Sequence, residues 1–404
     1  MRCTPAPKSF VVLTLICLVS LLLVGGCNTN KKHQTAKEKA YKQWAAARAN
    51  VMYGLARDQY ATGNFENSRK TVTEAIKLNP DHVQLRLLSA KLAIESAQLE
   101  MAERELAEAR RINPKEAEAD YLAGVVYQRW QKPERALEFY TSASEKNPGE
   151  LAYLLARSEM LVAAGRQEEA LRLLQDKVVY FEHSAIIRDA VGQLLMQFKR
   201  YGEAADMLRT ASILATDDVT IQEHLALALF MAERYAEAID PLQRLVRRPE
   251  FEKRADLYFA LGRSQLETGK LRDARGSLET AARLNGGDAT VWLALARTAM
   301  QLGDHSRAEL SLRRAQSIDP ASGEARLLMG YLRLKQGKTE EALANFQRAN
   351  ALDSSDTVSL CMIGYALQQL GRHDEATRYY AKALKMNPGD EMARKLLASV
   401  DVME

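Results

Sequence analysis

A unit of 34 residues recurs ten times between Ala49 and Asp390, interrupted by a two-residue insertion at Lys253 and Arg254. The eighth position of each copy is Ala, Gly or Ser, and the twentieth is Ala in nine copies and Ser in the first. A period of this length is typical of a supersecondary unit that cannot bury its own apolar face and must stack on its neighbours. The repeat therefore predicts a linear stack of similar units.

Each unit is predicted to be helical, because no stretch alternates apolar and polar residues for long enough to indicate a strand. Small residues at positions 8 and 20 allow two helix axes to approach where they cross. Glycines near position 15 suit the positive φ that ends the first helix, and prolines at position 32 end the second. The glycines are Gly63, Gly165, Gly269, Gly303, Gly337 and Gly371, and the prolines are Pro80, Pro114, Pro148, Pro320 and Pro388.

These positions resemble the tetratricopeptide repeat (TPR), which combines large residues at several fixed positions with Gly or Ala at 8, Ala at 20 and 27, and Pro at 32. The last copy shows the pattern in Leu360, Ile363, Gly364, Leu367, Ala376, Tyr380, Ala383 and Pro388. The resemblance implies an all-α fold, a right-handed α-solenoid of ten TPR helix hairpins with capping helices at both ends. Repeats 1 to 10 are then residues 49–82, 83–116, 117–150, 151–184, 185–218, 219–252, 255–288, 289–322, 323–356 and 357–390.

The segments that flank the repeats are predicted to cover the two ends of the stack, as solenoids require. The sequence turns helical from about Thr35, so residues 27–48 combine a basic tether with a helix that leads into repeat 1. Residues 391–404 are expected to form a C-terminal capping helix. The apolar faces consist of Ala40, Tyr41, Trp44 and Ala47 before the repeats and of Met392, Leu396, Leu397 and Val400 after them.

Two repeats depart from the pattern. Repeat 4 has Ser158 and Lys177 where small apolar residues are expected, and it ends without proline. Repeat 6 carries Pro241 inside its second helix and is followed by the two-residue insertion. Either these repeats have drifted within a long array, or they change the pitch of the stack and shape a binding surface or a hinge.

Residues 1–26 have the proportions of a signal peptide. Their apolar run, Phe10 to Val24, has 15 residues, fewer than the ~20 that span a bilayer. The run ends in Gly25-Gly26-Cys27, which resembles the lipobox of bacterial lipoproteins. The resemblance implies cleavage before Cys27 and acylation of its thiol with diacylglycerol, whose chains include palmitate. The alternative is an uncleaved anchor with an incidental cysteine.

A lipoprotein of this kind lies in the bacterial cell envelope. Asn28 follows the cysteine, and the absence of Asp at this position favours the outer membrane, with the repeats facing the periplasm. Residues 1–48 carry a net charge of +7 within a whole-chain charge of +4, which leaves −3 on residues 49–404. Because a nucleic-acid-binding protein needs a basic stripe on its folded part, we expect no nucleic-acid partner. The tether charges either hold the chain near anionic lipid headgroups or keep it solvated.

No residue pattern supports catalysis or a cofactor. Gly337-Lys338-Thr339 imitates the end of a phosphate-binding loop, but no strand precedes it and its spacing to the previous glycine is wrong. None of the six histidines stands at metal-ligand spacing from a Cys, Asp or Glu. We therefore expect no enzyme activity, no cofactor and no metal.

The TPR resemblance implies a concave groove lined by the first helix of each repeat. In the middle and rear repeats this groove is predicted to be apolar, a surface that suits an amphipathic helix or an extended apolar peptide. The residues expected to bind a partner are Met196, Phe230, Phe259, Leu293, Met300 and Tyr331. Alternatively, many of them pack against neighbouring helices and expose little. Position 9 never carries Asn, so the carboxylate clamp of chaperone-binding TPRs is not expected.

These features predict a non-catalytic, lipid-anchored TPR scaffold that binds other proteins in the cell envelope. The architecture is similar to that of lipoproteins that assist the assembly of pilus, secretion or polysaccharide-export machines. A second interpretation is an adaptor that recruits or regulates a periplasmic enzyme of cell-wall or polysaccharide metabolism.

Overall fold

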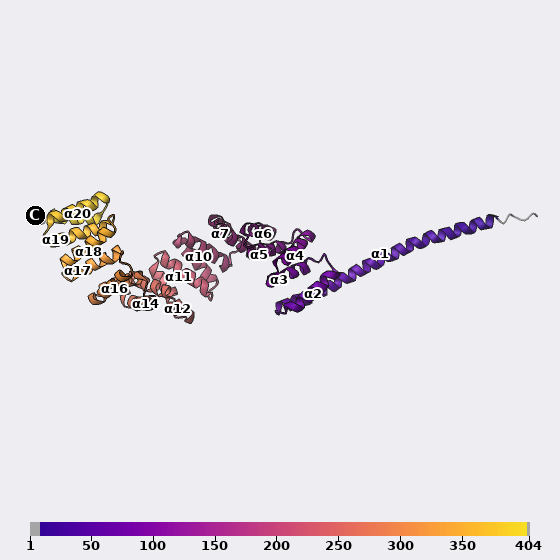
Figure 1. Cartoon of the computed structure of the whole chain (residues 1–404), viewed down its shortest axis with the longest axis horizontal. Helices are drawn as coiled ribbons and strands as arrows, with labels where there is room; N and C mark the ends of the chain where they lie inside the picture. Colours follow the sequence, from indigo (N-terminus) through magenta and orange to yellow (C-terminus); the bar gives the residue numbers. More distant parts are fainter. Residues whose placement is uncertain (1–8, 402–404) are drawn as a thin grey trace, which may run out of the picture. The chain divides into compact units, whose positions relative to one another are not determined.

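The computed structural model describes the backbone of residues 9–401 and the side chains of residues 33–400. Over the described backbone the chain forms twenty-one α-helices and one short 3-10 helix, η1, without a strand (Figure 1). Successive helices pack as hairpins that follow one another along the chain. The fold is therefore the all-α solenoid that the repeat predicts.

The chain divides into two compact units, residues 1–179 and 180–404. The helices of the first unit are α1 (Ser9–Ala61), α2 (Phe65–Leu78), α3 (Val83–Glu95), α4 (Leu99–Ile112), α5 (Ala117–Arg129), α6 (Pro133–Lys146), α7 (Leu151–Ala163) and α8 (Gln167–Val178). Those of the second are α9 (Ala185–Gln197), α10 (Tyr201–Leu214), α11 (Val219–Met231), α12 (Tyr235–Val246), η1 (Pro249–Phe251), α13 (Ala255–Glu267), α14 (Leu271–Leu284), α15 (Ala289–Gln301), α16 (His305–Ile318), α17 (Gly323–Lys335), α18 (Thr339–Leu352), α19 (Thr357–Gln369), α20 (His373–Met386) and α21 (Glu391–Asp401). In repeats 2 to 10 the first helix begins at the first residue of the repeat.

Only one of the two irregular repeats coincides with the division between the units. The boundary falls between Val179 and Tyr180, where repeat 4 lacks its proline and turns replace the end of the second helix. Repeat 6 lies wholly within the second unit. Its Pro241 lies within α12, which continues past it. Phe251 belongs to η1, in the connection between α12 and α13, and its side chain is buried.

The two helices of a repeat meet where the side chain at position 24 lies against position 8. A Cβ atom added to Gly364 would lie 2.5 Å from the ring of Tyr380, and one added to Gly124 would lie 2.5 Å from the ring of Tyr140. These separations are far shorter than any van der Waals contact, so the ring occupies the volume that the glycine leaves free. All three aromatic residues at position 24 face a glycine at position 8.

Position 15 ends the first helix of each repeat with a left-handed residue. The six glycines predicted there have φ of 74 to 77°. In repeats 2, 3, 5 and 6 the same position has φ of 55 to 58° without glycine. The residues are Ala97, Gln131, Lys199 and Glu233. A left-handed conformation costs a non-glycine residue ~1–2 kcal/mol, which the packing of the flanking helices offsets.

The C-terminal end of the stack is covered as predicted. Helix α21 packs on α19 and α20 of the last repeat, with Ala393 and Val400 buried. Leu396 and Leu397 lie partly buried against the same core, which includes Tyr380. The last repeat therefore does not present an open apolar face.

At the N-terminal end the helix leads into repeat 1 as expected, but it also includes the residues expected to form a tether. Helix α1 runs without a break from Ser9 to Ala61, so residues 35–48 continue directly into the first helix of repeat 1 (Figure 1). The side chains of the Phe10–Val24 run and of Cys27 lie outside the described residues. Across residues 33–400, whose side chains are described, no helix has the length and apolar character needed to cross a membrane.

The packing at position 8 leads to a direct test with two glycines of the second unit. A Cβ atom on Gly330 would lie 2.4 Å from the Phe346 ring, whereas one on Gly276, in the exposed interior of α14, meets no atom within 4 Å. We expect Gly330→Ala to lower the stability by about 1–3 kcal/mol through overpacking. Gly276→Ala should raise it by about 0.5–1 kcal/mol, because alanine favours the helix. Thermal and urea unfolding measure both, and equal effects would contradict the assignment.

Candidate functional site

The six predicted groove residues all lie on first helices of the second unit. Met196 is on α9, Phe230 on α11 and Phe259 on α13, and each is half-buried. Leu293 and Met300 are on α15, and Tyr331 is on α17. The helices are therefore those on which the TPR resemblance places the groove.

The structure brings two of these residues into contact. The rings of Phe230 and Phe259 are edge to face, with centroids 6.2 Å apart, and the centroid of the Tyr235 ring lies 6.1 Å from that of Phe230. Such aromatic pairs contribute ~0.5–1.5 kcal/mol beyond the area that they bury. Because Phe230 and Phe259 stay half-exposed while touching, they form the best-defined apolar surface among the predicted residues.

The remaining residues pack into the core to different degrees. Leu293 is only 8% exposed and belongs to a core cluster with Leu312 and Met329, against which Met300 also packs. Tyr331 lies edge-on to the Phe346 ring at 5.5 Å, in another cluster, and burial raises its pKa. Leu293 therefore has little surface for a partner, and the predicted groove residues do not form a single cluster.

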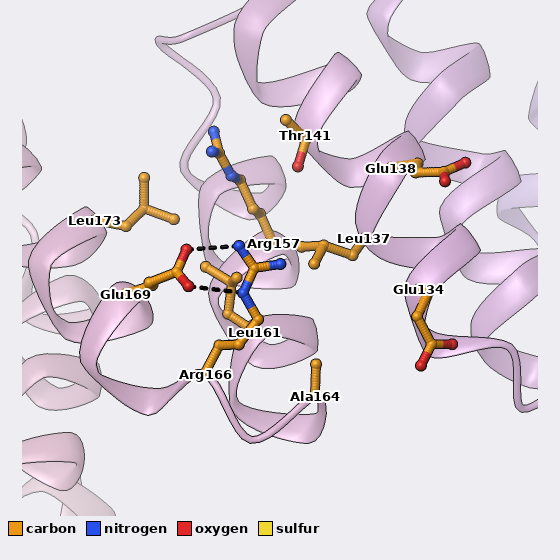
Figure 2. A pocket seen from close by; sticks show the side chains of 10 residues that line it. All are labelled: Glu134, Leu137, Glu138, Thr141, Arg157, Leu161, Ala164, Arg166, Glu169 and Leu173. Atoms are coloured by element: carbon orange, nitrogen blue, oxygen red, sulfur yellow. Dashed lines mark hydrogen bonds and ion pairs between the residues drawn. The ribbon is translucent and has the colours of Figure 1, made fainter.

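A second candidate site, which was not predicted from the sequence, lies in the first unit. Helices α6, α7 and α8 line an open cavity of about 760 Å³ (Figure 2). Its lining combines apolar side chains with charged groups of both signs. The lining residues are Glu134, Leu137, Glu138, Thr141, Arg157, Leu161, Ala164, Arg166, Glu169 and Leu173.

Arg157 distinguishes this cavity from the matching site of a later repeat. It stands at position 7 of repeat 4, which is apolar and buried in repeats 5 to 10. Its Nε is buried without a hydrogen-bond partner, and its Nη1 donates to the Ser144 hydroxyl at a long 3.4 Å. The equivalent cavity between repeats 7 and 8 has Leu295 at position 7, and its volume is only about 180 Å³.

The charged groups around the cavity pair within their own helical segments. The Arg166 guanidinium donates to both carboxylate oxygens of Glu169, at 2.8 and 2.6 Å, as Figure 2 shows. Glu138 lies 3.5 Å from Arg135 of the same helix. Among the described residues no ion pair spans the cavity, so both walls keep polar groups that can meet a partner side chain.

In the second unit, ion pairs bridge the helices at the positions that match the walls of this cavity. Arg234 and Asp206 occupy the positions in repeats 6 and 5 that correspond to Arg166 and Glu138, and their side chains bridge α12 to α10 at 2.6 Å. Arg209 and Glu237 add a second bridge between the same helices. Two ion pairs thus join neighbouring second helices here, whereas the matching positions of repeats 3 and 4 remain apart.

Two histidines form hydrogen bonds that shape the fold. His224 Nδ1 lies 2.7 Å from Asp189 Oδ1, and this hydrogen bond raises the pKa of the imidazole. His82 caps α3, because its Nδ1 accepts from the backbone N–H of Leu85 at 3.2 Å, and burial lowers its pKa. Among the described residues no group of three or more His, Cys, Asp or Glu side chains could hold a metal ion.

Comparisons with known proteins agree with this architecture. A tetratricopeptide repeat model matches residues 60–124, and a model of the C-terminal domain of cilia and flagella-associated protein 70 matches residues 215–404. No curated protein matches the sequence significantly. With the helix hairpins described above, these matches support a chain built of tetratricopeptide repeats, and neither model is that of an enzyme family.

Three solved structures are similar to parts or most of the chain at low sequence identity. MamA is 19% identical over 42% of this chain and 92% of its own, with a TM-score of 0.38. Cut9–Hcn1 of the APC/C is 15% identical over 91% of this chain and 95% of its own, with a TM-score of 0.47. A TPR protein of Thermus thermophilus is 22% identical over 46% of this chain and 99% of its own, with a TM-score of 0.39. No functional argument follows from these likenesses.

Replacing Arg157 tests the origin of the cavity. Arg157→Leu restores the aliphatic residue found at position 7 in repeats 6 to 8 and removes a buried unpartnered donor. We expect it to raise the stability by about 1 kcal/mol. The matched control, Arg172→Leu on the exposed side of α8, should change it by less than about 0.5 kcal/mol. Urea unfolding measures both variants, and a clear loss of stability in Arg157→Leu would show that the guanidinium supports the fold.

Proposed function

We propose that this protein is a non-catalytic TPR scaffold of the bacterial cell envelope, anchored to the membrane through acylated Cys27 and binding other proteins through its repeats. The lipobox-like Gly25-Gly26-Cys27 after a 15-residue apolar run carries the proposal of the anchor. The repeat architecture supports the proposal that the protein is a scaffold. Asn28 favours the outer membrane, with the repeats in the periplasm.

Helix α1 supports this arrangement because it connects the proposed anchor to the repeats without a flexible linker. Cys27 and Ala49 belong to the same helix. At 1.5 Å per residue, the 22 steps from Cys27 to Ala49 separate the anchor from repeat 1 by roughly 33 Å along the helix axis. The anchored chain thus presents repeat 1 at a defined distance from the lipidated residue.

The partner surface proposed for the repeats is centred on Phe230 and Phe259, with Met196 and Met300 beside it on neighbouring first helices. Aromatic rings and flexible thioethers suit an apolar segment of a partner protein, such as an amphipathic helix. The partners belong to an envelope assembly of the pilus, secretion or polysaccharide-export kind. Neither the anchor nor the scaffold role requires a cofactor.

Metabolic labelling tests the anchor. Wild-type chain expressed in a bacterial host with an alkynyl palmitate analogue should take up label and fractionate with membranes. Cys27→Ala should lose the label and accumulate as the uncleaved precursor. The control is Cys361→Ala, because that thiol is buried in the last repeat, where burial raises its pKa to about 11, and it should not be acylated. Unlabelled wild-type protein, or label that persists in Cys27→Ala, would overturn the lipoprotein proposal.

A further inference from the structure

An exposed apolar stripe runs along α1 at the open end of the first unit. Its positions alternate by four and three residues, so they lie on one face of the helix. The α1 stripe consists of Lys37, Tyr41, Trp44, Arg48, Val51 and Leu55. The apolar side chains are exposed by 60% (Tyr41), 48% (Trp44), 75% (Val51) and 54% (Leu55).

The position of Leu55 in its repeat explains why the stripe is exposed to solvent. Leu55 is at position 7 of repeat 1, and the apolar residues at position 7 in all later repeats are buried, as Ala123 and Val191 are. A preceding repeat covers this face elsewhere in the array. Within residues 33–400 nothing covers it in repeat 1, whereas α21 covers the opposite end of the chain.

The spacing of the stripe is that of a coiled-coil seam. Apolar residues repeating every 3.5 positions keep the seam facing a partner helix of the same kind. The seam spans 19 residues, Lys37 to Leu55, or roughly 27 Å at 1.5 Å per residue. Coils this short are weak alone, but here the part of the helix from Ala49 onward is already held by packing on α2 and α3.

We propose that the α1 stripe binds the α1 stripe of a second copy of this chain, with the two helices antiparallel. An antiparallel seam centred between Trp44 and Arg48 places Tyr41 opposite Val51 of the second copy and Lys37 opposite its Leu55. It also places Arg48 opposite the second copy's Trp44. This arrangement uses every apolar residue of the stripe.

The charged residues of the stripe favour antiparallel over parallel pairing of the two α1 helices. A parallel pair would set Lys37 against Lys37 and Arg48 against Arg48 in the seam, where like charges repel. In the antiparallel pair each guanidinium meets an indole ring instead, a favourable cation–π contact. Arg48 already lies over Trp44 of its own chain, with its guanidinium carbon 5.3 Å from the ring centroid. Asp58, next along the stripe, flanks Lys37 of the second copy.

Pairing of this kind goes beyond the scaffold role and does not depend on lipidation. It doubles the number of repeat arrays held at one site. Because the two helices run in opposite directions, two lipid anchors reach the same membrane when the paired helices lie along its surface. A chain whose stripe instead rests on lipid headgroups or binds an unrelated protein would be a monomer when purified.

Disulfide trapping tests the pairing and its direction in the full-length chain in detergent. Chains with Tyr41→Cys mixed with chains with Val51→Cys should form a disulfide-linked dimer on mild oxidation. Either variant alone should not exceed the wild-type background from the native cysteines, because identical residues lie roughly 15 Å apart along the antiparallel seam. Absence of a dimer in the mixture, or equal dimer in each single variant, overturns the proposal.

Light scattering provides an independent measurement. The wild type should be dimeric, and Trp44→Glu with Leu55→Glu should be monomeric at the same concentration, with unchanged helix content because both side chains are exposed. Leu310→Glu is the matched control, since that leucine is 67% exposed on α16, and it should remain dimeric. A monomeric wild type, or a dimer that survives the double substitution, contradicts the proposal.

Discussion

The fit between positions 8 and 24 holds each hairpin together, and the stack depends on it. Where position 24 is a ring, as in Tyr140, Phe346 and Tyr380, position 8 is a glycine whose missing side chain leaves the space that the ring fills. Where position 24 is Val or Leu, position 8 is Gly, Ala or Ser. Because each repeat buries its apolar face only against its neighbours, a loose hairpin weakens the packing of the repeats beside it.

Most of the fold could be predicted because the period sets geometry as well as secondary structure. Small residues recur where helices cross, and the first helices of repeats 2 to 10 begin where the period places them. Two features could not be read from the repeat. Ala97 and Lys199 adopt left-handed φ although their residue types do not signal it. The helix that leads into repeat 1 was predicted from about Thr35, but its extension back through the basic tether was not, because that polar stretch has no apolar periodicity.

The sites were predicted less well because exposure depends on what a neighbouring helix places opposite each residue. The TPR resemblance placed Phe230, Phe259 and Leu293 on the first helices that line the groove. It could not show that Leu293 is buried while Phe230 and Phe259 keep exposed surface, because all three occupy the same kind of helix. The cavity of the first unit did leave a signal in the sequence. Arg157 is the one charged residue at position 7, and comparing that position across all repeats would have identified it.

A double-mutant cycle between Gly364 and Tyr380 tests the central claim most directly. Gly364→Ala alone should destabilise the protein, because its Cβ would lie 2.5 Å from the ring. Combined with Tyr380→Leu it recreates the Ala and Leu pair of repeats 2, 6 and 8, so the two substitutions together should cost at least about 1 kcal/mol less than the sum of their separate effects. Strictly additive effects in urea unfolding would contradict the account, because they would show that positions 8 and 24 do not share one packing space.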